Sequence, residues 1–259
     1  MNILRKLAVL SCLLVLALSL RAQELRVAAA ADLQFAMKDL AVQFENKTGT
    51  KVVVSYGSSG NFSTQIQNGA PFDLFFSADV VYAQQLVSAE FADPQSFFVY
   101  AQGHLVLWAP ANASLGLAGR GFEALKDPRV QKIAVANPEH APYGRAAIAA
   151  LQKAKLYDQV KSKLVYGDNI SQAAQFAQSG SAQVGIIALS LTFAESMKGG
   201  ERWEIPTDLY PPIQQAAVII RTSSHKAAAN AFLEFVKSDE GRKLLSNYGF
   251  TSPQAQQKP

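Results

Sequence analysis

Hydrophobic and polar residues alternate in blocks along this chain. Residues 25–30, 51–56 and 73–76 form short apolar or β-branched runs of strand length. Each run is followed by a stretch with apolar residues at helical spacing, at 32–44, from 58 toward 69, and at 79–87. This order of three strands, each followed by a helix, predicts an α/β sheet with mainly parallel strands.

A second unit of the same kind begins near His104. Its pattern predicts strands at 105–108, 131–135, 164–166 and 184–187, with helices at 143–154 and from 169 to 180. A further strand at 216–220 precedes two C-terminal helices at 226–236 and 240–248. Because no repeat, low-complexity run or long linker interrupts the pattern, we expect two α/β lobes joined by short crossings. Residues 23–104 and 214–259 would form the first lobe, and residues 105–213 the second.

The N-terminus has the layout of a secretory signal peptide. Arg5 and Lys6 precede an apolar stretch at 7–20, and the small residue Ala22 is followed by polar residues. Fourteen residues are too few for an ordinary membrane span. We therefore expect residues 1–22 to be removed on export. A lipoprotein anchor at Cys12 is the alternative, but few apolar residues precede it and the apolar run continues beyond it.

Removal of this segment changes the charge balance. The whole chain has 24 basic and 20 acidic residues, and cleavage leaves 21 basic residues against the same 20 acids. A nucleic-acid role thereby loses its main support. The single Cys excludes a disulfide framework and any multi-Cys metal site, and the three His residues show no metal-protease spacing.

Four strand-to-helix junctions carry capping residues and free backbone N–H groups, at 31–32, 57–60, 142–144 and 168–170. In an open parallel sheet such junctions gather beyond the carboxyl ends of the strands, where ligands bind. Several helix N-termini aimed at one point would bind an anion without a positive side chain. At any single junction an ordinary helix cap explains the residues equally well, and the pattern does not show that the four converge.

Catalysis has little support in the sequence. Residues 57–60 resemble a nucleophile elbow but are one residue short of it, and the sequence places no histidine base near Ser58 or Ser59. His140 is expected in a loop or on the surface. Asp73 and Asp79 flank a predicted strand. We interpret Asp73 as a residue at the edge of that strand and Asp79 as a helix cap, rather than the two as a catalytic pair.

Seven motifs follow one another along the chain after residue 22: AAADL at 29–33, SYGSSG at 55–60, GAPFDLFFSAD at 69–79, NPEHAPYG at 137–144, GDNISQAA at 167–174, VGIIA at 184–188 and YGF at 248–250. In these motifs and their order, which cover essentially the whole chain after residue 22, the chain resembles the molybdate-binding proteins of bacterial ABC transporters.

The resemblance implies a two-lobe periplasmic binding protein of type II, the Venus-flytrap fold, with an oxyanion held between the lobes. Hydroxyl and backbone N–H groups would bind it, without Arg or Lys. By position, Ser59 would donate its hydroxyl and N–H, Tyr143 and Ile170 their backbone N–H groups, and Ser58 would be an adjacent contributor. Molybdenum would be held as molybdate by these groups, with no direct metal ligand.

Two positions depart from the family pattern. Asp32 stands where many relatives have a ligand Ser, and Ala188 where some have a ligand Tyr. A carboxylate cannot donate to an ionised oxyanion and would repel it. One hypothesis is that Asp32 caps its helix with its side chain turned inward, while the Tyr143 hydroxyl replaces the donor missing at Ala188. Alternatively, Asp32 accepts a proton from a protonated anion such as phosphate or arsenate.

The expected function is capture of molybdate, and of tungstate, by a monomeric periplasmic receptor that delivers its ligand to a membrane permease. No enzyme activity and no cofactor are expected. The alternatives are a binding protein for another tetrahedral oxyanion (sulfate, phosphate or arsenate) and, from a different class, a secreted serine hydrolase using Ser58 or Ser59.

Overall fold

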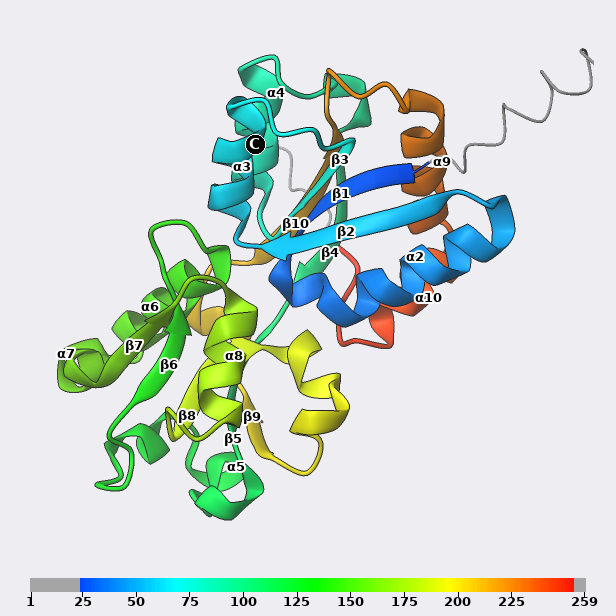
Figure 1. Cartoon of the computed structure of the whole chain (residues 1–259). Helices are drawn as coiled ribbons and strands as arrows, with labels where there is room; N and C mark the ends of the chain where they lie inside the picture. The colour runs from blue at the N-terminus through cyan, green and yellow to red at the C-terminus, as the bar shows by residue number, and fades with distance from the viewer. Residues whose placement is uncertain (1–23, 254–259) are drawn as a thin grey trace, which may run out of the picture.

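The computed structural model describes residues 24–253, which form two α/β lobes, each built on a five-stranded sheet (Figure 1). The sheet of the first lobe has the order β2-β1-β3-β10-β4, and that of the second lobe has the order β7-β6-β8-β5-β9. The strands of the first sheet are β1 (Glu24–Ala30), β2 (Lys51–Gly57), β3 (Leu74–Ser77), β4 (Phe98–Gly103) and β10 (Ile213–Ile219). Those of the second are β5 (Leu105–Ala109), β6 (Ile133–Ala136), β7 (Leu164–Gly167), β8 (Val184–Ala188) and β9 (Glu201–Glu204).

Both sheets are mixed. In the first, β1 runs parallel to β2 and β3, whereas β10 is antiparallel to β3 and β4. In the second, β6 is parallel to β7 and β8, whereas β5 is antiparallel to β8 and β9. The three strands from which parallel pairing was expected, β1, β2 and β3, are parallel as predicted, and the later strands β4, β5, β9 and β10 make both sheets mixed. β4 is the last strand before the chain leaves the first lobe, and β10 is the strand with which it returns. Both are antiparallel to the strands beside them.

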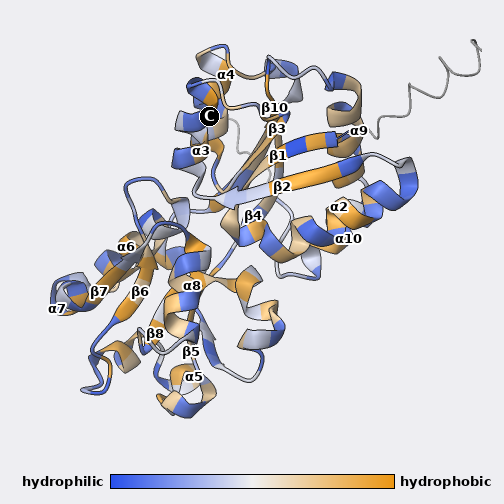
Figure 2. Cartoon of the chain, viewed as in Figure 1, coloured by the Kyte–Doolittle hydropathy of each residue, from blue (hydrophilic) through white to orange (hydrophobic). Residues whose placement is uncertain are grey.

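Helices cover both faces of the first sheet. On one face, α2 (Gln34–Thr48), α9 (Lys226–Lys237) and α10 (Asp239–Ser246) bury a cluster that includes Leu40, Phe44 and Phe232. On the other, α3 (Ser59–Gln67) and α4 (Val80–Ser88) bury Phe62 and Leu86. Apolar colour concentrates on the strands and inner helix faces, and polar colour on the outer faces (Figure 2). The pattern is that of a sheet core covered by amphipathic helices.

The second sheet is covered by α6 (Pro142–Lys153) and α8 (Ile170–Gln178), with the short helices α5 (Leu117–Arg120) and α7 (Tyr157–Val160) at its periphery. One hydrophobic cluster fills this lobe and extends to Ala30, Ala31 and Ala78 of the first lobe. The two lobes therefore touch through apolar residues.

Two crossings connect the sheets. The first is short, because β4 ends at Gly103 and β5 begins at Leu105. The second leads from the end of β9 at Glu204 to Ile213, where β10 begins. Within residues 24–253 no helix is long and apolar enough to cross a membrane. The predicted signal peptide, residues 1–22, lies outside the described residues.

Candidate functional site

All five residues predicted to bind an oxyanion line one hollow between the lobes. Asp32 lies in the 3-10 turn after β1 (Ala31–Leu33), Ser58 and Ser59 at the β2–α3 junction, and Tyr143 and Ile170 in the first turns of α6 and α8. The other lining residues are Ala30, Ala31, Gly57, Ala78, Ala141 and Pro142. The hollow has a volume of about 10 Å³, roughly the space that one water molecule needs. An oxyanion would require the walls to move apart.

The two serines present hydroxyl groups to this hollow. Ser59 is fully buried, and its Oγ accepts the backbone N–H of Ala78 at 2.9 Å, which leaves the hydroxyl hydrogen to donate. The Oγ of Ser58 lies 2.9 Å from Nδ1 of His140. Both serines follow the carboxyl end of β2, which runs parallel to β1, so the topology places them beside Asp32.

Three helices of at least nine residues begin at the hollow: α3, α6 and α8. At α8 the Oδ1 of Asn169 accepts the N–H groups of Ser171 and Gln172, so the cap does not use the N–H of Ile170. At α6 the first helical residue is Pro142, which has no N–H, and Tyr143 follows it. Helix N-termini carry partial positive charge, so the hollow has the electrostatics of an anion site.

Asp32 is 1% exposed, and its two carboxylate oxygens have different surroundings. Oδ2 accepts hydrogen bonds from Nε2 of Gln215 at 2.6 Å and from the hydroxyl of Tyr143 at 3.0 Å. Oδ1 is buried and has no hydrogen-bond partner. Burial raises the pKa of Asp32 to about 6, although the hydrogen bonds from Gln215 and Tyr143 favour the charged form.

The hypothesis that Asp32 caps its helix is wrong, although the side chain does turn inward. The 3-10 turn that contains Asp32 has no side-chain cap. The backbone N–H groups of Asp32 and Leu33 interact with the carboxyl group and lower its pKa, but neither is a full hydrogen-bond partner of the buried Oδ1. The carboxylate instead takes its hydrogen bonds from Gln215 and Tyr143, the two side-chain donors within its reach.

The expectation that the Tyr143 hydroxyl replaces the donor missing at Ala188 is also wrong. This hydroxyl donates to Asp32 and accepts from Nε2 of Gln215 at 3.1 Å, so its hydrogen is already used. Ala188 is buried at the end of β8 and is not among the residues that line the hollow. Two residues later, Ser190 donates its hydroxyl to the backbone carbonyl of Asp32 at 2.7 Å.

Sequence reasoning missed three residues around Asp32. The Oε1 of Gln215 accepts the hydroxyl of Tyr100 at 2.6 Å, which fixes the amide so that its nitrogen faces Asp32. Gly103 is packed against this network, since a Cβ added there would lie 2.7 Å from Nε2 of Gln215 and would collide with the Tyr143 hydroxyl. The only signal in the sequence for Gln215 was its position directly before the apolar run of β10.

His140 contacts the site, although nothing in the sequence placed a histidine near Ser58. It is in the turn before α6, as expected for a loop residue, but its side chain is only 21% exposed. Its Nδ1 contacts Ser58, and its Nε2 lies 3.7 Å from Oδ1 of Asp168. Asp168 is 59% exposed and also accepts from Nδ2 of Asn61 at 3.3 Å. A serine-hydrolase triad needs a buried carboxylate hydrogen-bonded to the histidine, and Asp168 does not meet that requirement.

Polar contacts join the two lobes around the hollow. The N–H of Gly60 donates to the carbonyl of His140 at 2.9 Å, and Ser171 donates to Oε1 of Gln34 at 2.8 Å. At the rim, Arg145 forms an ion pair with Asp79. Asp79 also caps α4 through the N–H of Tyr82 at 3.0 Å, as predicted. The lobes are therefore in contact on several sides of the site, which is a closed arrangement.

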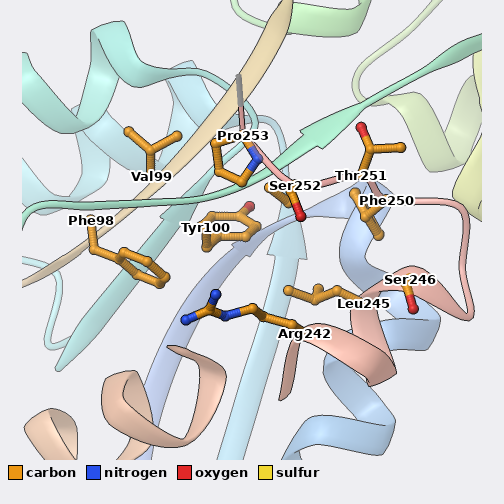
Figure 3. Close-up of a pocket in the computed structure, with 11 residues that line it drawn as sticks. Phe98, Val99, Tyr100, Arg242, Leu245, Ser246, Phe250, Thr251, Ser252 and Pro253 are labelled. Atoms are coloured by element: carbon orange, nitrogen blue, oxygen red, sulfur yellow. The ribbon is translucent and has the colours of Figure 1, made fainter. Parts of the chain in front are cut away.

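A second hollow lies away from these residues, at the edge of the first sheet (Figure 3). It has a volume of about 390 Å³ and lies between β4, α10 and the end of the described chain. Figure 3 shows the rings of Phe98 and Tyr100 on one side and the guanidinium of Arg242 below them. None of the five predicted ligand residues lines it.

Comparison with known proteins agrees with this geometry. Residues 25–251 match the family described as bacterial extracellular solute-binding protein. The molybdate-binding protein ModA of Rhodobacter capsulatus is 40% identical over 237 residues, which is 92% of each chain. ModA of Azotobacter vinelandii is 41% identical over 236 residues, covering 91% of this chain and 92% of that protein.

Solved structures give the same result. The periplasmic molybdate-binding protein of Azotobacter vinelandii superposes with a TM-score of 0.83 at 36% identity, over 89% of this chain and all of that one. The sulfate-binding protein SubI of Mycobacterium tuberculosis shares the fold, with a TM-score of 0.73 at 18% identity over 89% of this chain and 87% of that one. The predicted two-lobe type II fold is confirmed, and these relatives are binding proteins rather than enzymes. The chain belongs to the family of bacterial extracellular solute-binding proteins.

Proposed function

We propose that this protein binds molybdate between its lobes outside the cytoplasm and delivers it to the permease of an ABC transporter. One observation carries the proposal: Asp32, Ser58, Ser59, Tyr143 and Ile170, widely separated in sequence, line one hollow. Relatives about 40% identical over most of the chain are named for binding molybdate. Export by the signal peptide at 1–22 and a monomeric receptor in the periplasm are parts of the same proposal.

The chemistry of the proposed site suits a dianion. Molybdate is fully ionised at neutral pH and can only accept hydrogen bonds, which the serine hydroxyls and the helix N-termini supply. Hydrogen bonds to a charged group contribute about 1.5–3 kcal/mol each. Several of them would exceed the free-energy cost of association and lobe closure. No organic cofactor takes part, and the molybdenum atom has no direct protein ligand because the protein contacts its oxygens.

Binding requires the lobes to separate and close again around the anion, because the lobes are in contact on several sides of the hollow. We assign residues 23–104 and 214–259 to one lobe and residues 105–213 to the other. The crossings at His104 and at 205–212 would then be the hinges. Closure would form the surface that docks on the permease.

Selectivity among tetrahedral oxyanions would come from the size of the cavity and from whether the anion itself carries a proton. Sulfate has the charge of molybdate but is smaller, whereas tungstate is nearly the same size and is proposed to bind as well. Monohydrogen phosphate carries a hydrogen atom. In a site that offers only hydrogen-bond donors, this hydrogen would face another donor and bind nothing. One observation favours a protonated anion as a second candidate, namely the unpartnered acceptor Oδ1 of Asp32.

Calorimetric titration of residues 23–259 with molybdate, tungstate, sulfate and phosphate at neutral pH tests the proposal. We expect tight binding of the first two anions and none of the last two. Binding of phosphate in preference to molybdate would support the second candidate, and no binding of any of these four anions would contradict both.

A further inference from the structure

The carboxyl group of Asp32 has one satisfied oxygen and one unsatisfied oxygen. Oδ2 accepts two hydrogen bonds, from Gln215 at 2.6 Å and from Tyr143 at 3.0 Å. Oδ1 is buried without a partner on a residue that lines the proposed anion site. Such an atom needs a donor if it is ionised, but it becomes a donor itself if it is protonated.

No cation compensates this carboxylate. Among residues 24–253, it takes hydrogen bonds from the neutral side chains of Gln215 and Tyr143, the backbone N–H groups of Asp32 and Leu33 also favour its charged form, and no cationic side chain contributes to its pKa shift. Tyr143 and Tyr100 are the other titratable groups of this network. Burial and the charge of Asp32 raise the pKa of both well above the usual value, so both stay neutral.

The charged groups on the surrounding elements have other partners. Asp79, at the start of α4, adds negative charge near Tyr100 and is paired with Arg145 of α6. His140, in the turn before α6, contacts Ser58 rather than Asp32. An ionised Asp32 and a dianion in this hollow would therefore repel each other at short range in a water-poor setting.

We propose that Asp32 binds the oxyanion as a neutral acid, with a proton on Oδ1 that is donated to an anion oxygen, so that capture of a dianion takes up one proton. The inference rests on the proposed function. The proton comes from solvent, no covalent bond to the anion forms, and the complex carries one negative charge fewer than Asp32 and the anion carry apart.

Gln215 and Tyr143 are positioning residues in this account. Their hydrogen bonds make Oδ2 the accepting oxygen, so the proton resides on Oδ1, which is the oxygen without a partner. The hydroxyl of Tyr100 in turn holds the Gln215 amide by its oxygen, which leaves the amide nitrogen to donate to Asp32. The acid hydroxyl would then serve as the donor that a serine supplies in relatives with Ser at this position.

Affinity should therefore depend on pH with a defined slope. Burial already raises the pKa of Asp32 to about 6 in the free protein. Above that pH the proton must be taken from solvent, so the dissociation constant for a dianion rises about tenfold per pH unit. Between about pH 7 and pH 9 we expect roughly a hundredfold loss of molybdate affinity.

Calorimetry of molybdate binding in two buffers of different ionisation enthalpy, at about pH 8, measures the number of protons taken up. We expect one proton per molybdate for the wild-type chain. The Asp32→Asn variant has a permanent amide donor in place of the acid, and we expect it to bind without proton uptake and without the pH slope. His140→Gln controls for titration of that imidazole and should leave the uptake unchanged.

Tight molybdate binding by the wild type without proton uptake would overturn this inference and leave the proposed function standing. Proton uptake that persists in Asp32→Asn or disappears in His140→Gln would also overturn it, because the proton would then reside elsewhere. Absence of molybdate binding by the wild type would contradict the proposed function and this inference with it. If Asp32→Asn does not fold, the dependence of wild-type molybdate affinity on pH still tests the inference. An affinity that stays constant between pH 7 and pH 9 would overturn it.

Discussion

The hydroxyl of Tyr143 donates to Oδ2 of Asp32 across 3.0 Å, and this hydrogen bond joins the two lobes beside the proposed anion site. Tyr143 lies in the first turn of α6 of the second lobe, and Asp32 follows β1 of the first. Gln215, on the returning strand β10, donates to both residues. Lobe closure, the position of the carboxyl group and its pKa are therefore physically linked.

The effect of pH on stability should reveal the raised pKa of Asp32. The native state holds this proton more tightly than the unfolded chain does, because the pKa rises from 3.8 to about 6 on folding. The stabilisation is fully present below the unfolded pKa of 3.8 and is lost as the pH rises through about 6. Between pH 4 and pH 7 the free energy of unfolding of Asp32→Asn should therefore rise by about 2.4 kcal/mol relative to that of the wild type.

Urea denaturation of both proteins at several pH values measures this difference in the free energy of unfolding. The comparison cancels the titration of the other carboxyl groups, since the two proteins share them. A constant difference between pH 4 and pH 7 would show that Asp32 titrates as an ordinary carboxyl group.

Removal of the Ser59 hydroxyl should weaken anion binding more than it weakens the fold. Ser59→Ala loses one hydrogen bond to a charged ligand, so molybdate affinity should fall roughly tenfold to a hundredfold. Calorimetry measures the change. Ser181→Ala removes an exposed hydroxyl of the second lobe and should bind as the wild type does. Equal affinities for the two variants would place the anion away from Ser59.

Gly103 tests the importance of the network behind Asp32. A Cβ at this position would collide with the Tyr143 hydroxyl and approach Nε2 of Gln215 to 2.7 Å. Gly103→Ala should therefore displace both donors from Asp32 and lower molybdate affinity at least tenfold. The matched control is Gly119→Ala, since a Cβ at Gly119 meets nothing within 4 Å. Unchanged affinity in Gly103→Ala would mean that the position of Asp32 does not matter for binding.

Gly60 tests the contribution of lobe closure. A Cβ here would lie 2.8 Å from the carbonyl oxygen of His140 and 2.7 Å from the Tyr82 hydroxyl, whereas alanine is otherwise favoured over glycine in a helix. Gly60→Ala should weaken binding, because the closed arrangement is disfavoured, while the first lobe keeps its stability. Calorimetry and thermal denaturation together separate the two effects. Wild-type affinity would show that this contact does not limit closure.

The sequence patterns were sufficient for most elements but not for all. The strands and helices predicted in the first lobe up to residue 88 lie within a few residues of those observed, because their apolar periodicity is strong. The strand β9 has the sequence ERWE, with exposed charged residues at an edge, so no apolar run marks it. The antiparallel direction of β10 depends on the path of the chain through the other lobe, which local periodicity does not contain.

The positions of Ser59 and Ile170 at the starts of α3 and α8 were predictable, because each follows a predicted strand and a turn. The partners of Asp32 were not predictable, since Gln215 and Tyr100 lie 183 and 68 positions further along the chain and meet it only in the fold. For the same reason the sequence did not show that His140 contacts Ser58, or that the Tyr143 hydroxyl is already used.

The central claim is that the anion lies between the lobes at the helix N-termini. A crystal structure of the molybdate complex, with anomalous diffraction recorded at the molybdenum absorption edge, tests it most directly. We predict one anomalous peak with its oxygens in hydrogen-bond range of the Ser59 hydroxyl, the N–H groups of Tyr143 and Ile170, and Oδ1 of Asp32. A peak in the second hollow beside Arg242, with none between the lobes, would contradict the account.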